Sequence, residues 1–210
     1  MRAAERLIAN RGVENVSIRD IVSTAGQKNE SALQYHFKNF TGLIDAIHEQ
    51  RSKQIQAKRA ELLQALLART SEPTLRQLCM LMVQPAFEFA RAEVDFRHYV
   101  KAFGHKLMLS ETSPLIKVTM QGGGGPSGQQ IAHLLQGMLT HLDTATYWQR
   151  MEAAVRFCSA SMYHQARQKS AFQGDSAELF LHRLIDALVG LLSAPMSAET
   201  KTLTKHQKPF

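Results

Sequence analysis

The sequence predicts an all-α protein. Apolar residues recur every three or four positions along most of the chain, which is the period of an amphipathic helix. No stretch shows the sustained apolar-polar alternation between hairpin turns that marks strands. Hydrophobic residues make up 44% of the 210 residues, which is enough for a substantial core. These observations together favour a helical globular protein.

Three short helices are expected at the N-terminus. The first covers residues 2–11 and ends at Gly12, because glycine readily adopts the positive φ of a helix C-cap. The second begins after Ser17, since Ser17 and Asp20 resemble a capping box with Val16 and Ile21 placed as a hydrophobic staple. It ends at Gly26, and a third helix covers about 30–37. Their inward faces are expected to consist of Ala3, Ala4, Leu7, Ile8, Ile18, Ile21, Val22, Ala25, Leu33 and Phe37.

Longer helices are expected in the rest of the chain. Thr41 can cap a helix that runs to about Ala68, and the polar middle of this helix, His48 to Glu61, suits a bridge between two bodies. Residues 196–210 lack periodicity and are expected to be a disordered tail. The remaining helices are placed near 74–91, 93–109, 126–142, 145–172 and 176–193, with a short one at 114–120.

The charge is unevenly distributed. Residues 1–60 hold ten Lys and Arg against six Asp and Glu, residues 61–200 hold twelve of each, and residues 201–210 hold three against none. A basic N-terminal quarter on a neutral body is typical of a nucleic-acid-binding head, although a solvated basic surface gives the same count. Two short helices joined by a tight turn in that quarter indicate a helix-turn-helix.

Several other classes find no support in the sequence. There is no apolar run of membrane-spanning length and no signal peptide, so we expect a cytoplasmic protein without a membrane partner. Cys79 and Cys158 lack metal-like spacing, and we expect them to be buried thiols. The pairs His98 and His105, and Asp45 and His48, lack further metal ligands. Catalytic motifs are absent as well, so we expect no metal, no cofactor and no enzyme activity.

The N-terminal segment resembles a known family. Residues 3–47 are similar to the DNA-binding domain of the TetR (tetracycline repressor) family of transcriptional regulators, and the closing segment, residues 184–195, is similar to the last helix of one large subgroup. Between Gly26 and Tyr35 the chain has one residue more than the commonest version. The resemblance rests on Ala3 to Gly12, on Ile18 to Gly26, and on Tyr35, His36, Phe37, Lys38 and Leu43.

The resemblance implies a set of DNA contacts. Tyr35, His36 and Lys38 match family residues that contact the DNA backbone, and the start of the third helix is expected to enter the major groove. The side chains of Asn29, Ser31 and Gln34 are suited to base edges, with Asn and Gln preferring adenine. Hydroxyls, cations and helix N-termini suit phosphate. By that chemistry the expected phosphate contacts are Ser17, Arg19, Lys28 and Thr41.

The resemblance also implies a function and a division of the chain. Residues 1–46 are expected to form the helix-turn-helix domain, and residues 47–195 a ligand-binding and dimerisation domain. The expected function is repression that ends when a small, largely apolar effector releases the protein from a palindromic operator. A helical enzyme or a small-molecule carrier without DNA binding is the alternative. A carrier would account for the C-terminal two thirds but not for the N-terminal segment.

A ligand cavity is expected within residues 80–120. These residues are rich in methionine and aromatic side chains, which are more often simple core residues. The basic residues Arg97, His98, Lys101 and His105 could meet an acidic group of a ligand, although solvation is the commoner fate of such a cluster. The residues expected to line the cavity are Phe87, Phe96, Tyr99, Phe103 and Met108.

A homodimer is expected through the last two long helices. One apolar stripe lies on helix 145–172 and two lie on helix 176–193, so that one stripe can cover its own domain while another meets a partner. Two helices from each subunit would then form a four-helix interface. The stripes are Trp148, Met151, Val155, Cys158 and Met162; Phe180, Leu184, Leu188 and Leu191; and Leu181, Ile185, Val189 and Leu192.

Overall fold

The computed structural model describes residues 1–27, 29–109, 111, 113, 115–116 and 124–206. These residues form ten α-helices and one short 3-10 turn and contain no strand, which confirms the all-α prediction. The expected short helix at 114–120 lies mostly outside the described residues, as does Lys28. Within the described part, no single helix is both long and apolar enough to cross a membrane. Helix α10 (Gly174–Ser193) with the start of α11 (Ala198–His206) meets these criteria only as a pair bent by 56°.

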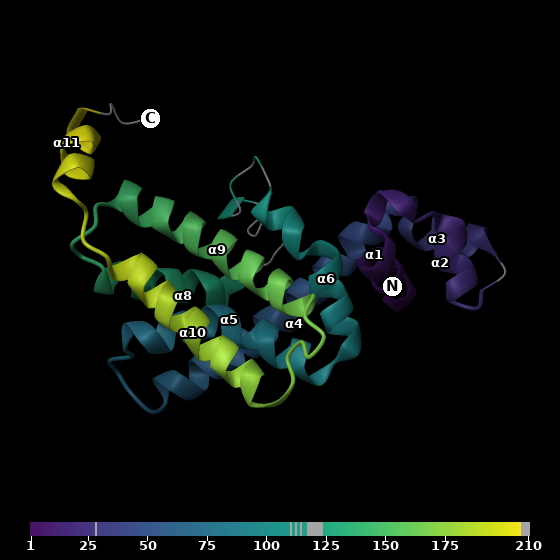
Figure 1. The fold of residues 1–210 in the computed structure, drawn as a ribbon, viewed down its shortest axis with the longest axis horizontal. Coiled ribbons are helices and arrows are strands. Elements are labelled where there is room, and N and C mark those ends of the chain that lie inside the picture. Colours follow the sequence, from purple (N-terminus) through teal and green to yellow (C-terminus); the bar gives the residue numbers. More distant parts are fainter. Residues whose placement is uncertain (28, 110, 112, 114, 117–123, 207–210) are drawn as a thin grey trace.

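Three short helices form the head of the molecule, at one end of an elongated body (Figure 1). They are α1 (Arg2–Arg11), α2 (Ile18–Thr24) and α3 (Glu30–Phe37), and a 3-10 turn (Val13–Asn15) joins the first two. The predicted capping box is confirmed, because the Asp20 amide donates to Ser17 Oγ at 3.2 Å and the Ser17 amide donates to Asp20 Oδ2 at 2.9 Å. Hydrogen bonds from Ser17 hold the pKa of Asp20 below its usual value.

The core of the head includes part of the body. Most of the predicted inward residues are buried or half-buried, but Ala25 is exposed at the C-cap of α2, where the chain turns outward. Two residues of helix α6 (Val94–Met108), Ala102 and Phe103, complete the head's apolar cluster. The head is therefore packed on α6 and shares its core with it. The fully buried members of the cluster include Ala4, Ile8, Ile21, Leu43 and Ile47.

Helix α4 (Phe40–Leu67) connects the head to the body. The expected cap at Thr41 is wrong, because Asn39 Oδ1 accepts the Gly42 amide at 2.8 Å and Thr41 lies in the first turn. A Cβ atom on Gly42 would clash with the carbonyl oxygen of Phe37, so the close approach of α3 to α4 requires glycine here. The expected domain boundary at residues 46 and 47 falls inside this continuous helix.

The body consists of α5 (Leu75–Ala92), α6 (Val94–Met108), α8 (Gly125–Met138), α9 (Thr144–Ala166) and α10 (Gly174–Ser193). Helix α9 ends six residues before the predicted 172. The chain turns after Ala166 without a glycine or proline that would have predicted the helix end. Beyond the turn, the Phe172 ring is buried against those of Phe87 and Phe180, at 5.9 and 6.2 Å between centroids. Helix α8 ends at Met138, before the predicted 142, and Leu139 and Leu142 are buried in the body's core beyond its end.

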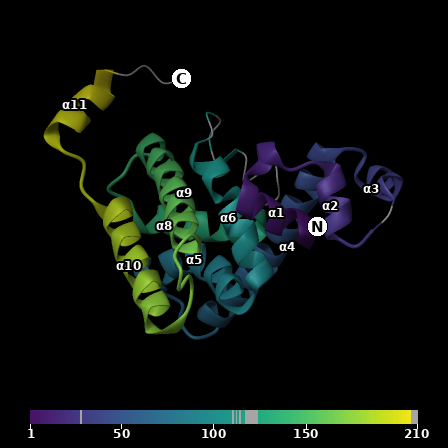
Figure 2. The same cartoon turned by 45° about the vertical axis from the view of Figure 1, so that its right-hand side comes forward.

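The tail is partly helical, which corrects the expectation of disorder over these residues. Helix α11 (Ala198–His206) follows α10 and projects from the body at the end opposite the head (Figures 1 and 2). Ser197 Oγ accepts the Thr200 amide at 3.1 Å and so caps its first turn. The described side chains of α11 are mostly exposed. The cap at Ser197 therefore stabilises the start of this helix. The sequence did not predict the helix because its residues form no amphipathic stripe.

A buried ion pair joins the head to α4. Arg51 Nε and Nη2 donate to the two carboxylate oxygens of Glu5 at 2.7 and 2.9 Å, and both residues are at most 5% exposed. The guanidinium also lies 3.5 Å from Glu93 Oε2 and 5.3 Å from the centroid of the Phe96 ring. Burial opposes the charge of Arg51, but the hydrogen bonds and charge of Glu5 outweigh it, so the pKa of Arg51 is raised.

The substitution Glu5→Ala should lower the free energy of unfolding by about 3 kcal/mol, because it leaves the Arg51 charge buried without its main partner. The matched control is Glu49→Ala, which removes an exposed ion pair with Lys53 and should cost no more than about 0.5 kcal/mol. Urea denaturation followed by circular dichroism measures both. Equal losses for the two variants would contradict the importance of the buried pair.

Candidate DNA interface and ligand cavity

The exposed side of α3 carries most of the residues predicted to contact DNA. Ser31, Gln34, Tyr35, His36 and Lys38 are all exposed, and the Tyr35 side chain is 85% exposed. The Tyr35 ring lies edge-on to that of His36 at 5.4 Å. Lys38 forms the C-cap of α3 with a φ of 64°, and its amide donates to the Gln34 carbonyl at 2.8 Å. These side chains are brought together on one surface.

Asn29 has a structural role that the sequence interpretation overlooked. Its Oδ1 accepts the Ser31 amide at 2.8 Å and caps α3. Paired recognition of adenine needs both the oxygen and the nitrogen of the amide, and the oxygen is already engaged. Gln34 is therefore better placed than Asn29 to read a base.

The expected phosphate contacts are divided between two places. Arg19 is exposed on α2, and Ser17 is exposed at its N-cap, where the hydroxyl donates to the Asp20 carboxylate. Thr41 is exposed in the first turn of α4, where it lines the body's cavity. Lys28 lies outside the described residues. Ser17 and Arg19 thus lie at the start of α2, and Thr41 lies at the start of α4.

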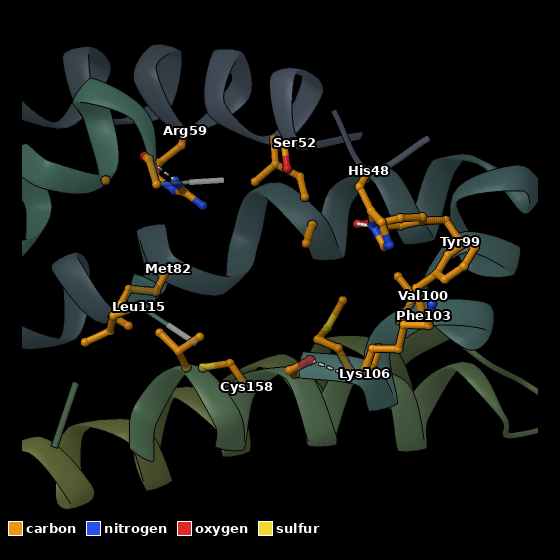
Figure 3. A pocket seen from close by; sticks show the side chains of 18 of the residues that line it. His48, Ser52, Arg59, Met82, Tyr99, Val100, Phe103, Lys106, Leu115 and Cys158 are labelled. Atoms are coloured by element: carbon orange, nitrogen blue, oxygen red, sulfur yellow. Dashed lines mark hydrogen bonds between the residues drawn. The ribbon is translucent and has the colours of Figure 1, made fainter. Parts of the chain in front are cut away.

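A cavity of about 780 Å³ lies between α4, α5, α6, α8 and α9 (Figure 3). Phe96, Tyr99 and Phe103 line it, as predicted. Phe87 does not line the cavity, because its ring packs on Phe172 within the core. Met108 does not line it either, because it lies at the end of α6, where its carbonyl accepts a hydrogen bond from Arg156 at 2.9 Å. The cavity is of the size that small-molecule sites usually have.

The apolar stripe of α9, which the sequence assigned to the dimer interface, lines this cavity. Its five members are Trp148, Met151, Val155, Cys158 and Met162. Burial raises the pKa of Cys158 to about 12, so its thiol is neutral. Both predicted stripes of α10 also turn mainly inward, since Leu181, Leu184, Ile185, Leu188 and Leu192 are all buried in the body's core.

The basic residues that were considered for an acidic ligand group do not line the cavity. Arg97 donates to the carbonyls of Ala90 and Arg91, and His98 lies 4.0 Å from Asp95. The sequence placed the ligand in residues 80–120 and so missed α4. The basic residues of the lining come instead from α4, α6 and α8: His48, Arg59, Lys106 and His133.

His48 is a partly buried polar residue at the head-side end of the cavity. Its Nδ1 lies 3.3 Å from the Tyr99 hydroxyl, and its ring lies 4.8 Å from that of Phe103. Burial, with a contribution from the charge of Lys106, lowers the pKa of His48 to about 4. The imidazole is therefore neutral at physiological pH, and Asp45 with His48 finds no third ligand, since the described residues hold no cluster of three metal-binding side chains.

The head and the cavity share walls. Phe103 belongs to the head's apolar cluster and also lines the cavity. Ile44, Phe40 and Val13 do the same from the head side. A change of packing in the cavity therefore reaches the core of the head through direct contacts.

Comparison with known proteins identifies the N-terminal part. Residues 1–47 match the family model described as "Bacterial regulatory proteins, tetR family". The head is therefore a TetR-family DNA-binding domain. No curated protein matches the chain. This domain indicates a DNA-binding transcriptional regulator, and the match covers the head and the first two turns of α4.

The pKa of His48 makes the stability of the protein depend on pH. Between about 4 and the ordinary value of 6.5, the unfolded chain binds a proton that the folded chain excludes, so the free energy of unfolding falls as the pH is lowered through this range. At about 1.4 kcal/mol per pKa unit, the loss reaches about 3 kcal/mol. Denaturation curves measured from pH 7 to pH 4 should show a smaller fall in the free energy of unfolding for His48→Gln than for the wild type. Identical pH profiles for the two proteins would contradict a buried, neutral His48.

Proposed function

We propose that this TetR-family regulator is a repressor that binds a palindromic operator as a homodimer and leaves it when a small, largely apolar effector fills the cavity. The observation that carries the proposal is the shared wall, because Phe103 and Ile44 belong both to the head's core and to the cavity. A ligand that changes their packing acts directly on the orientation of the head.

Operator recognition would use the exposed side of α3. Gln34 is the base-reading residue, since its amide can pair with adenine. Tyr35, His36 and Lys38, with Arg19 on α2, would contact phosphates. Their exposure and grouping support this division of roles.

The homodimer would form through the outer face of α9 and α10. A shallow groove between these helices is lined by Phe157, Ser161, Gln165, Leu179 and Phe180 among others, and Leu179 is 50% exposed. Ala187 and Gly190 are small and exposed on the same face of α10, which permits close helix approach. Two helices from each subunit then form a four-helix interface.

The switch has a thermodynamic requirement. The effector must bind the DNA-incompetent arrangement more tightly than the DNA-bound one, and operator DNA must weaken effector binding by the same factor. A coupling of about 1 to 3 kcal/mol, typical of such systems, changes affinity by roughly 5 to 150-fold. A small rotation of the heads suffices, because both must fit successive grooves of one duplex.

Selection of binding sites from random duplexes tests DNA recognition. The selected sites should be palindromes whose half-sites lie about one duplex turn, roughly 34 to 36 Å, or a multiple of it, apart. On the selected duplex, Lys38→Ala should weaken binding to all sequences and reduce its salt dependence, whereas Gln34→Ala should relax the preference for particular bases. Gel-shift titrations at several salt concentrations measure both. Equal loss of specificity in the two variants would contradict the assigned roles.

The substitution Ala187→Arg should disrupt the homodimer, because it places a long charged side chain in the centre of the proposed interface while Ala187 is exposed within one chain. Sedimentation equilibrium at micromolar concentration should give a monomer mass for this variant and a dimer mass for the wild type. Ser71→Arg, at an exposed position in the α4–α5 connection, is the control and should stay dimeric. A dimeric Ala187→Arg variant would place the interface elsewhere.

A further inference from the structure

The cavity is elongated along α4. At a rise of 1.5 Å per residue, the segment from His48 to Arg59 spans about 16 Å. Figure 3 shows these two side chains at opposite ends, with Ser52 between them. The lining residues of this helix share one face and lie three or four positions apart: His48, Ser52, Ile55 and Arg59.

The wall between these two ends is mainly apolar. Val83, Ile131 and Met151 are at most 5% exposed, and they come from α5, α8 and α9. Ile55, Met82 and Val155 extend the same surface. A ligand lying along α4 would therefore place an apolar body between two polar ends.

The charges of the cavity are arranged asymmetrically. Near the head, Asp45 and Lys106 line the cavity with opposite charges, and both are exposed. At the far end Arg59 is only partly exposed, and its Nη1 donates to the Gly124 carbonyl at 3.2 Å. Burial lowers the pKa of Arg59, yet arginine remains protonated at physiological pH. Among the described lining residues, the charge at the far end is therefore positive.

The first turn of α8 leaves room for this guanidinium. A Cβ atom at Gly128 would lie 3.3 Å from Arg59 Nη1, so alanine there would push the side chain aside by a few tenths of an ångström. Gly128 and Gly124 also line the cavity. Small residues thus let Arg59 lie against α8 at the end of the apolar surface.

We propose that the effector is an anionic amphiphile whose oxyanion head group binds Arg59 and whose apolar body lies along α4 toward His48. The inference rests on the proposed function, in which this cavity is the effector site. A carboxylate matches the planar fork of a guanidinium and can bind it with two hydrogen bonds. A cationic head group would be repelled by Arg59, and a neutral one would gain no charge-assisted hydrogen bond.

Three probes with the same chain and different head groups test the proposal: dodecanoate, dodecan-1-ol and dodecyltrimethylammonium. The two ionic probes are kept below their micellar concentrations and the alcohol below its solubility limit. Trp148 is the one tryptophan of the sequence and lines the cavity, so its fluorescence reports binding. Dodecanoate should bind about tenfold or more tightly than the alcohol, since a hydrogen bond to a charged group contributes about that factor. Dodecyltrimethylammonium should bind most weakly.

Two variants locate the head group. Arg59→Gln should reduce dodecanoate affinity about tenfold and leave that of dodecan-1-ol unchanged, while Gly128→Ala, which keeps the charge, should weaken dodecanoate alone by a smaller factor. The matched control is Lys58→Gln, since Lys58 pairs with Glu61 and Glu88 and does not line the cavity. It should bind all three probes as the wild type does. Thermal melting checks that each variant is folded.

The outcomes separate the inference from the proposed function. If dodecanoate and dodecan-1-ol bind equally and Arg59→Gln changes neither, the cavity is an effector site but the anionic head group is wrong. If Lys106→Gln and not Arg59→Gln abolishes the preference for dodecanoate, the head group binds at the opposite end and the inference is overturned. If no probe binds, the cavity fails as an apolar effector site and both proposals fall together.

Discussion

The arrangement of head and body depends on the buried pair of Glu5 and Arg51. Its bidentate geometry, at 2.7 and 2.9 Å, fixes α1 relative to α4, and the contact of the same guanidinium with Phe96 extends the constraint to α6. A buried charge that loses its partner is costly, so the head cannot move independently of these helices. Any motion of the head must carry the pair with it or break it.

Helix α6 belongs both to the cavity wall and to the head's core. Phe96, Val100 and Phe103 share one face of this helix and line the cavity, and Phe103 with Ala102 also contributes to the head's core. Protein interiors are close-packed and respond to added volume by shifting whole elements. A ligand in about 780 Å³ of cavity therefore has a short route to the head. The cavity and the head's core are in direct contact through side chains of α6 such as Phe103.

The sequence predicted what depends on local and periodic signals. Caps and apolar periodicity located α1, α2 and α3, and the recognised motif located the exposed residues around Tyr35. The partner of a buried polar residue depends on contacts between distant parts of the chain. The sequence therefore did not predict that Glu5 and Arg51, 46 positions apart, form a buried ion pair. Periodicity shows that the α9 stripe is apolar but not whether it faces a cavity or a partner. The charge count of residues 1–60 overestimated the basic surface of the head. Arg51 and Arg59 contribute to that count, but Arg51 is buried and Arg59 lines the cavity.

The central claim is that the cavity and the operator-binding surface share one packed core, and linkage tests it most directly. Dodecanoate is titrated into the dimer alone and into the dimer saturated with its selected operator, with Trp148 fluorescence as the signal. The shared core predicts that operator DNA weakens dodecanoate binding at least about fivefold, and that dodecanoate weakens operator binding by the same factor. Tight dodecanoate binding with an affinity unchanged by operator would contradict the claim.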